Sequence, residues 1–466
     1  MFRVLLDDLN GAKEYEFNPV NPRGGGYIVK YVNSNRTEMC STTLTFAQGD
    51  NEPTQPHLTV VGNDELQVNW VSASSEPGEV IYQVGGTDAW VTHKESRTPR
   101  TYKATDMCGV PATGTGFRNP GYFHSVSIPN LDQESAIRIR TGNATSKTFT
   151  SAPRILAGDA KRHKVLMVGD LGTSGAGQLG GARGFGVLEF PPESPGYVMT
   201  RYNESEFALG VIYGDISYAN GFSTVWDQYG DELANNGGML HPTVTSVGNH
   251  EYISLNNPTG WYPDFGDYRR PDSGGECGIP FSHRYPRDGD ESAHNYWFSF
   301  DFGLVHYIML STEHDYLNGS SQHQWLENDL SRVDRNKTPW IVATGHRPVY
   351  DPCSSNGVAG DIGEMLRSDV FSLLEKNNVD LYFTGHLHRY ARSSPVNGIV
   401  HVLAGSGRFT AYTCQNDLPH PMEKSLLNVG YVELDIISRR ELNATFWAYD
   451  SSSDEMKILD SFALAK

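Results

Sequence analysis

The second half of the chain repeats one pattern, in which an apolar run is followed by glycine and then by a side chain with an oxygen or nitrogen donor atom. Such apolar runs, bounded by turn signals, are typical of buried strands. The glycine permits a sharp turn where the strand ends. We therefore expect five strands whose polar residues gather at their carboxyl ends, where ligands bind in open α/β sheets. The glycine and polar pairs are residues 169–170, 214–215, 248–249, 345–346 and 385–386.

The segments between these strands predict the rest of the second half. Residues 321–333 and 368–376 have apolar positions at helical spacing and should form crossover helices. Repeated strand–helix units favour parallel strand pairs with helices on the faces of the sheet. Residues 430–437 and 443–449 return to a pattern typical of antiparallel strands. We predict an α/β domain with mixed β sheets and flanking helices over residues 156–466.

The first third of the chain has a different pattern, with short alternating strands separated by turn signals. This spacing predicts an all-β sandwich over residues 53–155, fibronectin type III-like or immunoglobulin-like, with Trp70 as its core aromatic residue. We expect a scaffold or lid, since no catalytic constellation lies there. Residues 1–52 contain too few strands to close a sandwich and read as a partial β region and linker whose beginning is missing.

Composition excludes several classes of protein. The net charge of −18 over 466 residues argues against a nucleic-acid or anionic-membrane partner. No apolar run approaches the roughly 20 residues that span a bilayer. The first residues are too acidic and too short for a secretory signal, yet six Asn-x-Ser/Thr triplets favour a secreted glycoprotein. The five cysteines form no Cys-x-x-Cys pair, so we expect one or two disulfides with a leftover thiol.

The polar strand ends form an ordered set that resembles a known signature. Gly-Asp170, Gly-Asp215, Gly-Asn249-His250-Glu251, Gly-His346 and Gly-His386-x-His388 resemble the five motifs of the metallophosphoesterase superfamily. Tyr218, three residues after Asp215, narrows the resemblance to the purple acid phosphatases. The resemblance covers residues 53–466 and is closer to the large plant-type members, some of which are nucleotide pyrophosphatases or phosphodiesterases. The stretches that resemble these plant-type members are residues 106–109, 119–122, 275–278, 311–315 and 345–348.

The resemblance implies a dinuclear metal centre and a hydrolytic reaction. The centre would hold Fe(III) and a divalent ion. Nitrogen and oxygen ligands do not distinguish Fe, Zn and Mn as the divalent ion. A metal-bound hydroxide would attack phosphate monoesters or anhydrides. Asp215 would bridge the two ions, and Asn249 would also contact substrate. The remaining ligands of one ion would be Asp170, Tyr218 and His388, and those of the other would be Asn249, His346 and His386.

A charge count is consistent with this ligand set. Two aspartates, a Tyr218 phenolate and a bridging hydroxide carry four negative charges, against five positive charges on the two ions. A surplus of about +1 remains to attract a phosphate anion. Asn249 preserves that surplus, because its carbonyl oxygen is neutral where an aspartate would cancel it. The hard phenolate in turn favours a trivalent ion.

Three further residues are candidates for substrate chemistry. His250 resembles the family's substrate-facing histidine and could hydrogen-bond phosphate or protonate the leaving group, or else only orient a carboxylate. Plant members often carry two more histidines where this chain has Ser355 and Asn356. His314 is the candidate replacement as acid–base group, with a structural role as the alternative. Arg347 could bind phosphate or form a structural salt bridge.

The predicted function is that of an acid phosphatase. The alternatives are a nucleotide pyrophosphatase or phosphodiesterase of the same fold and, more remotely, a catalytically silent protein that binds metal or phosphate. The glycine-rich stretch 172–186 lacks the Lys-Ser/Thr of a nucleotide P-loop, so we interpret it as a mobile loop beside the metal site. Substrates would be phosphate esters or nucleotides, and the location secreted, extracellular or vacuolar.

Overall fold

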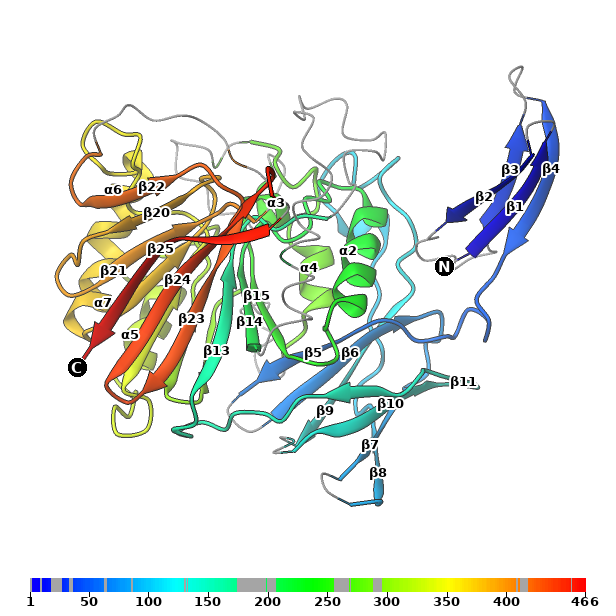
Figure 1. Ribbon diagram of the computed structural model, residues 1–466, viewed down its shortest axis with the longest axis horizontal. Helices are drawn as coiled ribbons and strands as arrows, with labels where there is room; N and C mark the ends of the chain where they lie inside the picture. Colours follow the sequence, from blue (N-terminus) through cyan, green and yellow to red (C-terminus); the bar gives the residue numbers. More distant parts are fainter. Residues whose placement is uncertain are drawn as a thin grey trace.

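The structure is a computed structural model, and it shows three strand-rich parts along the chain (Figure 1). The residues that it describes are 2–8, 11–17, 27–32, 37–62, 65–84, 87–129, 131, 133–173, 198, 207–254, 268, 270–287, 296–407, 410, 418–453 and 455–466. The glycine-rich stretch 172–186 lies outside these residues from position 174 onward. The prediction of a mobile loop there is therefore not addressed by the structure.

The N-terminal part consists of two antiparallel strand pairs, drawn in blue at the right of Figure 1. In the first, β1 (Phe2–Asp8) pairs with β2 (Gly11–Phe17), and in the second, β3 (Tyr27–Val32) pairs with β4 (Glu38–Leu44).

The second part contains two sheets around a shared core. Core residues come from both sheets, and Trp70 is 1% exposed, with its indole N–H donating to Thr141 Oγ1 at 2.9 Å. Trp70 is therefore a core aromatic residue, as predicted. One sheet has the order β5–β6–β9, and the other has the order β11–β10–β7–β8 with β12 also on β10. The strands are β5 (Thr54–Val61), β6 (Glu65–Ser72), β7 (Glu79–Gln83), β8 (Trp90–Lys94), β9 (Tyr122–Pro129), β10 (Ser135–Thr141), β11 (Ala144–Thr145) and β12 (Phe149–Ser151).

The third part is built on two mixed sheets that pack against each other through one large core. The six-stranded sheet has the order β15–β14–β13–β23–β24–β25 and the seven-stranded sheet the order β16–β17–β18–β19–β21–β20–β22. Strands β13–β15 are parallel, as are β17, β18, β19 and β21, while the remaining pairs are antiparallel. The strands are β13 (His163–Val168), β14 (Phe207–Tyr213), β15 (Thr243–Ser246), β16 (Phe298–Phe302), β17 (Val305–Met309), β18 (Trp340–Thr344), β19 (Leu381–Thr384), β20 (Tyr390–Ser393), β21 (Val400–Ala404), β22 (Met422–Leu426), β23 (Gly430–Ser438), β24 (Glu441–Asp450) and β25 (Glu455–Ala465).

Helices cover the outer faces of both sheets, so this part has four layers (Figure 1). On the six-stranded sheet lie α2 (Ser223–Asn235), α3 (Asn249–Tyr252) and α4 (Ile279–Arg284). On the seven-stranded sheet lie α5 (Ser321–Leu330), α6 (Gly360–Met365), η4 (Leu366–Val370) and α7 (Phe371–Lys376). The predicted fold class, mixed sheets with flanking helices behind an all-β region, is confirmed. The domain boundaries and the fibronectin-like assignment stay predictions.

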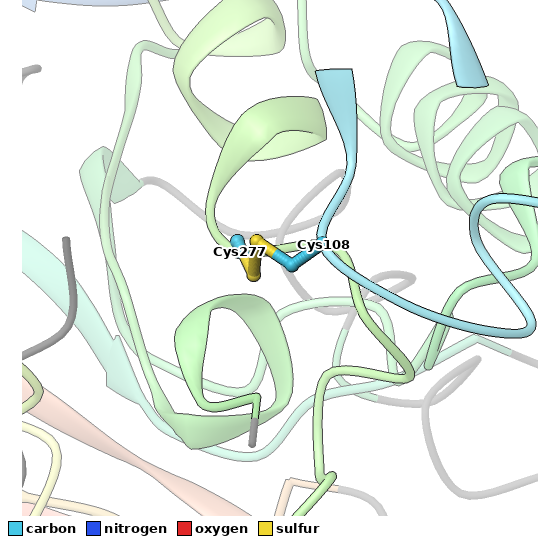
Figure 2. Close-up of a disulfide and its surroundings, with 2 residues drawn as sticks. All are labelled: Cys108 and Cys277. Carbon is cyan, nitrogen blue, oxygen red and sulfur yellow. A yellow bond between two sulfur atoms is a disulfide. The ribbon is translucent and has the colours of Figure 1, made fainter. Parts of the chain in front are cut away.

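A disulfide joins the N-terminal half of the chain to the third part. Cys108, after the short helix η1 (Ala104–Asp106), is bonded to Cys277, directly before α4 (Figure 2). Cys353 is also disulfide-bonded, whereas Cys40 is a free, exposed thiol. The expectation of one or two disulfides with a leftover thiol is confirmed. Within the described ranges, no helix has the length and hydropathy needed to cross a membrane.

Candidate metal centre

The polar residues that follow five strands converge at one edge of the two packed sheets. Asp170 follows β13 and Asp215 follows β14, both with left-handed backbone, at φ of 58° and 50°. Asn249 begins α3 after β15, and His346 follows β18. The two remaining histidines, His386 and His388, follow β19. The polar side chains at the strand ends thus lie in one region, as predicted from the sequence.

Steric crowding explains why glycine stands at three positions of the repeated pattern. A Cβ atom on Gly214 would lie 2.4 Å from Nδ1 of His346, and one on Gly385 would lie 2.3 Å from Oδ2 of Asp170. On Gly248 it would lie 2.3 Å from Oδ1 of Asp215. Such distances are too short for any side chain. At these three positions glycine therefore allows a donor atom of another site residue to approach closely.

One cluster of donor atoms is formed by Asp170, Tyr218 and His388. The Tyr218 hydroxyl donates to Asp170 Oδ1 at 2.9 Å and lies 2.9 Å from Nε2 of His388. That histidine nitrogen is also 3.1 Å from Asp170 Oδ1. Asp170, Asp215 and His388 each offer a donor atom, and these atoms lie within 4.8 Å of one another.

A second cluster contains Asn249, His346 and His386. Asn249 Oδ1 lies 2.9 Å from His346 Nε2 and 3.0 Å from His386 Nδ1. His346 Nε2 is also 3.2 Å from Asp215 Oδ1. Asp215, His346 and His386 offer donor atoms within 4.8 Å of one another, so Asp215 belongs to both clusters.

The two buried aspartates of the clusters pair with histidines. Asp170 and Asp215 are each 1% exposed, and in the part of the chain that the structure describes no Lys or Arg pairs with either. Burial lowers the pKa of His346, but the Asp215 charge outweighs it and raises that pKa to about 10. Buried carboxylates must be paired or coordinate a metal. Because carboxylate, phenol, amide and imidazole donors suit iron and divalent transition ions, the residues present fit a dinuclear metal centre.

Glu251 shapes the turn that carries Asp215, a role not predicted from the sequence. Its carboxylate accepts from the backbone N–H groups of Asp215 and Gly248, both at 2.9 Å, and of Ile216 at 2.8 Å. Burial and the charge of Asp215 raise the pKa of Glu251 to about 8. Glu251 is part of the Gly-Asn-His-Glu motif, but the sequence led to predicted roles only for Asn249 and His250.

His250 lies beside the two clusters. Its backbone N–H donates to Asp215 Oδ1 at 3.0 Å, and its Nε2 is 3.9 Å from Asp215 Oδ2. On the other side of the ring, Nδ1 is 2.7 Å from the amide oxygen Oδ1 of Asn220. Since an amide oxygen only accepts, Nδ1 carries the proton and Nε2 can face substrate. The side chain is 23% exposed, so a solute can reach it.

His314 is held among aromatic rings. Its ring centroid lies 4.0 Å from that of Tyr252 and 4.2 Å from that of Tyr296, with Trp297 at 5.6 Å. Its Nδ1 is 2.7 Å from Ser311 Oγ. These contacts are those of a packed side chain. The acid–base role of His314 stays a prediction.

Arg347 is 1% exposed and forms a buried ion pair with Glu313. Its guanidinium donates to both carboxylate oxygens of Glu313 at 2.9–3.1 Å and stacks 4.4 Å above the Tyr268 ring. Its Nη1 also lies 3.3 Å from His386 Nε2. The geometry is that of the structural salt bridge considered as the alternative, and phosphate binding by Arg347 stays a prediction.

Comparison with known proteins gives several matches. The model of the calcineurin-like phosphoesterases matches residues 163–390, the span from β13 to the first residue of β20. The chain is 30% identical to "Probable inactive purple acid phosphatase 27" of Arabidopsis thaliana over 367 residues, which are 74% of this chain and 56% of that protein. Other purple acid phosphatases of A. thaliana are 27–28% identical, so the chain is similar to the family that the motifs resemble.

Two other matches bear on fold and function. A nucleotide pyrophosphatase/phosphodiesterase of Hordeum vulgare is 29% identical, with 68% of this chain and 86% of that protein covered. The structure of a purple acid phosphatase from seeds of yellow lupin (Lupinus luteus) shares the fold, with a TM-score of 0.77 at 24% identity, covering 92% of this chain and 77% of that one. The chain spans 55–56% of the length of three of its A. thaliana relatives, all named probable inactive.

Proposed function

We propose that this protein hydrolyses phosphate monoesters or anhydrides with a dinuclear metal centre. The observation that carries the proposal is the pair of donor clusters that share Asp215. Two ions that act together on one phosphate need adjacent sites, and a shared carboxylate is the simplest way to join them. All the predicted ligand positions hold residues with suitable donor atoms, which supports the proposal.

The residues that would hold the two ions divide along the two clusters. When bound, the ions supply a nucleophilic water and neutralise the phosphoryl oxygens. The phenol of Tyr218 favours Fe(III) in its cluster, and the divalent partner would be Fe, Zn or Mn. One ion would be held by Asp170, Asp215, Tyr218 and His388, and the other by Asp215, Asn249, His346 and His386.

His250 would serve the leaving group. With Nδ1 donating to Asn220, its Nε2 can carry a proton when the ring is cationic and release it to the oxygen of the departing alcohol. The carboxylate of Asp215 lies 3.9 Å from Nε2.

A nucleotide pyrophosphatase or phosphodiesterase activity is the second candidate. The similarity to the barley enzyme of that name, over 86% of its length, favours it. The two candidates share the metal centre and differ in the group attached to the phosphorus atom. They are therefore separated by substrate and not by metal content.

The test is a substrate panel on metal-loaded protein. We would measure bound iron, zinc and manganese, then rates with p-nitrophenyl phosphate, bis(p-nitrophenyl) phosphate and ATP. Two ions per chain, with hydrolysis of the monoester or release of the terminal phosphate of ATP, support the first proposal. A preference for the diester, or cleavage of ATP to AMP and pyrophosphate, supports the second. Asp215→Ala serves as control, because it removes the residue that both clusters share. A protein that binds no ions and hydrolyses none of the three substrates would be a silent relative.

A secreted or vacuolar location is part of the proposal. Three of the glycosylation triplets begin at exposed residues, Asn143, Asn318 and Asn336. Exposure is what an attached glycan requires. A glycosidase-sensitive mass shift of the protein from its native source would support this location, and an unmodified protein would argue against it.

A further inference from the structure

Asn249 is held in place by a residue outside all the motifs, Asp272. The amide Nδ2 of Asn249 donates to Asp272 Oδ2 at 2.9 Å, while its Oδ1 faces His346 and His386. Among the described residues, the Asp272 side chain makes no other hydrogen bond or ion pair. Asn249 is therefore the hydrogen-bond partner of this half-buried carboxylate.

The orientation of the Asn249 amide decides whether it can be a ligand. Its oxygen can bind a cation, whereas its NH2 group offers only donor hydrogens. A rotation of 180° about the last bond would exchange the two groups at the metal cluster. An ionised carboxylate only accepts hydrogen bonds, so Asp272 selects the orientation in which the oxygen points inward.

The loop that carries Asp272 is hydrogen-bonded to the helix that carries Asn249. Ser273 N donates to Ile253 O at 2.9 Å and Gly278 N donates to Glu251 O at 2.9 Å, which connects this loop to α3 and its C-cap. The disulfide of Cys277 ties the same loop to the N-terminal half (Figure 2). Asp272 therefore has a fixed position relative to Asn249.

We propose that Asp272 is a positioning residue that orients and polarises Asn249 as a neutral metal ligand. The inference rests on the proposed function, since it requires that Asn249 binds an ion. The carboxylate draws the amide hydrogens and so increases the negative charge on the amide oxygen. It lets a neutral side chain bind more strongly without adding an anionic ligand to the ion.

The experiment measures metal binding directly. Protein stripped with a chelator would be titrated with Zn²⁺ alone, for wild type, Asp272→Ala, Asp272→Asn and Ser273→Ala. We expect Asp272→Ala to weaken one of the two binding events about 10–100-fold, the range typical of residues that support a ligand. Asp272→Asn keeps an acceptor oxygen without the charge, so its Zn²⁺ affinity should lie between those of wild type and Asp272→Ala. Ser273→Ala keeps the backbone bond to Ile253 and should match wild type.

Two further readouts separate positioning from a general structural role. The metal-free forms of all four proteins should melt at the same temperature, and excess Zn²⁺ should restore the turnover of Asp272→Ala. Unchanged Zn²⁺ affinity in Asp272→Ala, or a loss of both ions with a lower melting temperature of the metal-free form, would overturn the inference. If wild type binds two ions and hydrolyses phosphate esters or anhydrides, and Asp272→Ala has the same Zn²⁺ affinity as wild type, only this inference fails. If wild type binds none, the proposed function fails as well.

Discussion

The replacement of Tyr218 by phenylalanine tests the metal centre at one atom. The change removes the hydroxyl oxygen and keeps the ring, which packs 4.5 Å from His250 and 6.1 Å from His388. In the metal-free protein the cost is the hydrogen bond to Asp170 and the contact of the hydroxyl with His388 Nε2, both at 2.9 Å. A bond to a charged group contributes about 1.5–3 kcal/mol, and Asp170 Oδ1 keeps His388 at 3.1 Å, so the variant should fold.

The loss of affinity for Fe(III) in Tyr218→Phe should be larger than this cost in folding stability. Loss of a residue that only supports a ligand costs about 10–100-fold in metal affinity. Loss of a direct anionic ligand should therefore cost more than about 100-fold, or roughly 2.7 kcal/mol. A phenolate bound to Fe(III) also absorbs visible light by charge transfer. Iron-loaded wild type should be purple to pink, and Tyr218→Phe should be colourless. Activity need not vanish, because Asp170, Asp215 and His388 remain to hold a divalent ion.

The measurement is a visible absorption spectrum with metal analysis on wild type, Tyr218→Phe and Tyr252→Phe. Tyr252 is a matched control, since this phenol lies three residues along from Asn249 and packs against Tyr296 and His314. Its replacement should leave the colour unchanged. A wild type that holds oxidised iron and is colourless, or a Tyr218→Phe protein that retains the band, would refute Tyr218 as a ligand.

The remaining predictions concern five histidines. His386→Ala and His388→Ala should each leave less than about a tenth of the activity, because each removes a ligand of a different ion; higher residual rates would count against the assignment. His250→Ala should lower turnover with both ions still bound, and loss of metal would instead make it structural. His314→Ala should alter the pH–rate profile only if it is an acid–base group. His306, between two aspartates at 2.7 and 3.0 Å, has a pKa raised to about 9 although burial lowers it. Its contribution of about 3 kcal/mol should be fully present below pH 6.5 and disappear as pH rises to about 9, so wild type and His306→Gln should converge in urea unfolding over that range.

The residues that the sequence predicts well are those whose role is encoded locally. An apolar run, a glycine and a donor residue stand together in the chain, so the approach of Asp170, Asp215 and His346 followed from their positions at parallel strand ends. The alternating pattern likewise predicted the sandwich and Trp70. Local encoding is strong because strand burial and turn geometry depend on adjacent residues.

The residues that the sequence did not reveal depend on contacts between distant segments. Asp272 lies in a loop without a strand or helix pattern, and its partner Asn249 is chosen by the tertiary structure. Arg347 follows His346, which we propose as a metal ligand, and so resembled a phosphate-binding residue. Its actual partner, Glu313, follows a different strand, and neither segment alone indicates the pair. Charged residues near a site can support it or bind substrate, and only the three-dimensional contacts distinguish the two.

The pairing of β13 with β23 has a consequence for biosynthesis. β13 ends two residues before Asp170, and one of its two neighbours in the sheet begins at Gly430, about 260 residues later. At roughly 5–20 residues per second, a ribosome needs about 10–50 s to cover that distance. During this interval the nascent β13 has an open edge, which is prone to wrong pairing until the late strands emerge. Metal insertion should accordingly follow completion of the polypeptide, and chains that stall before residue 430 should be substrates for chaperones.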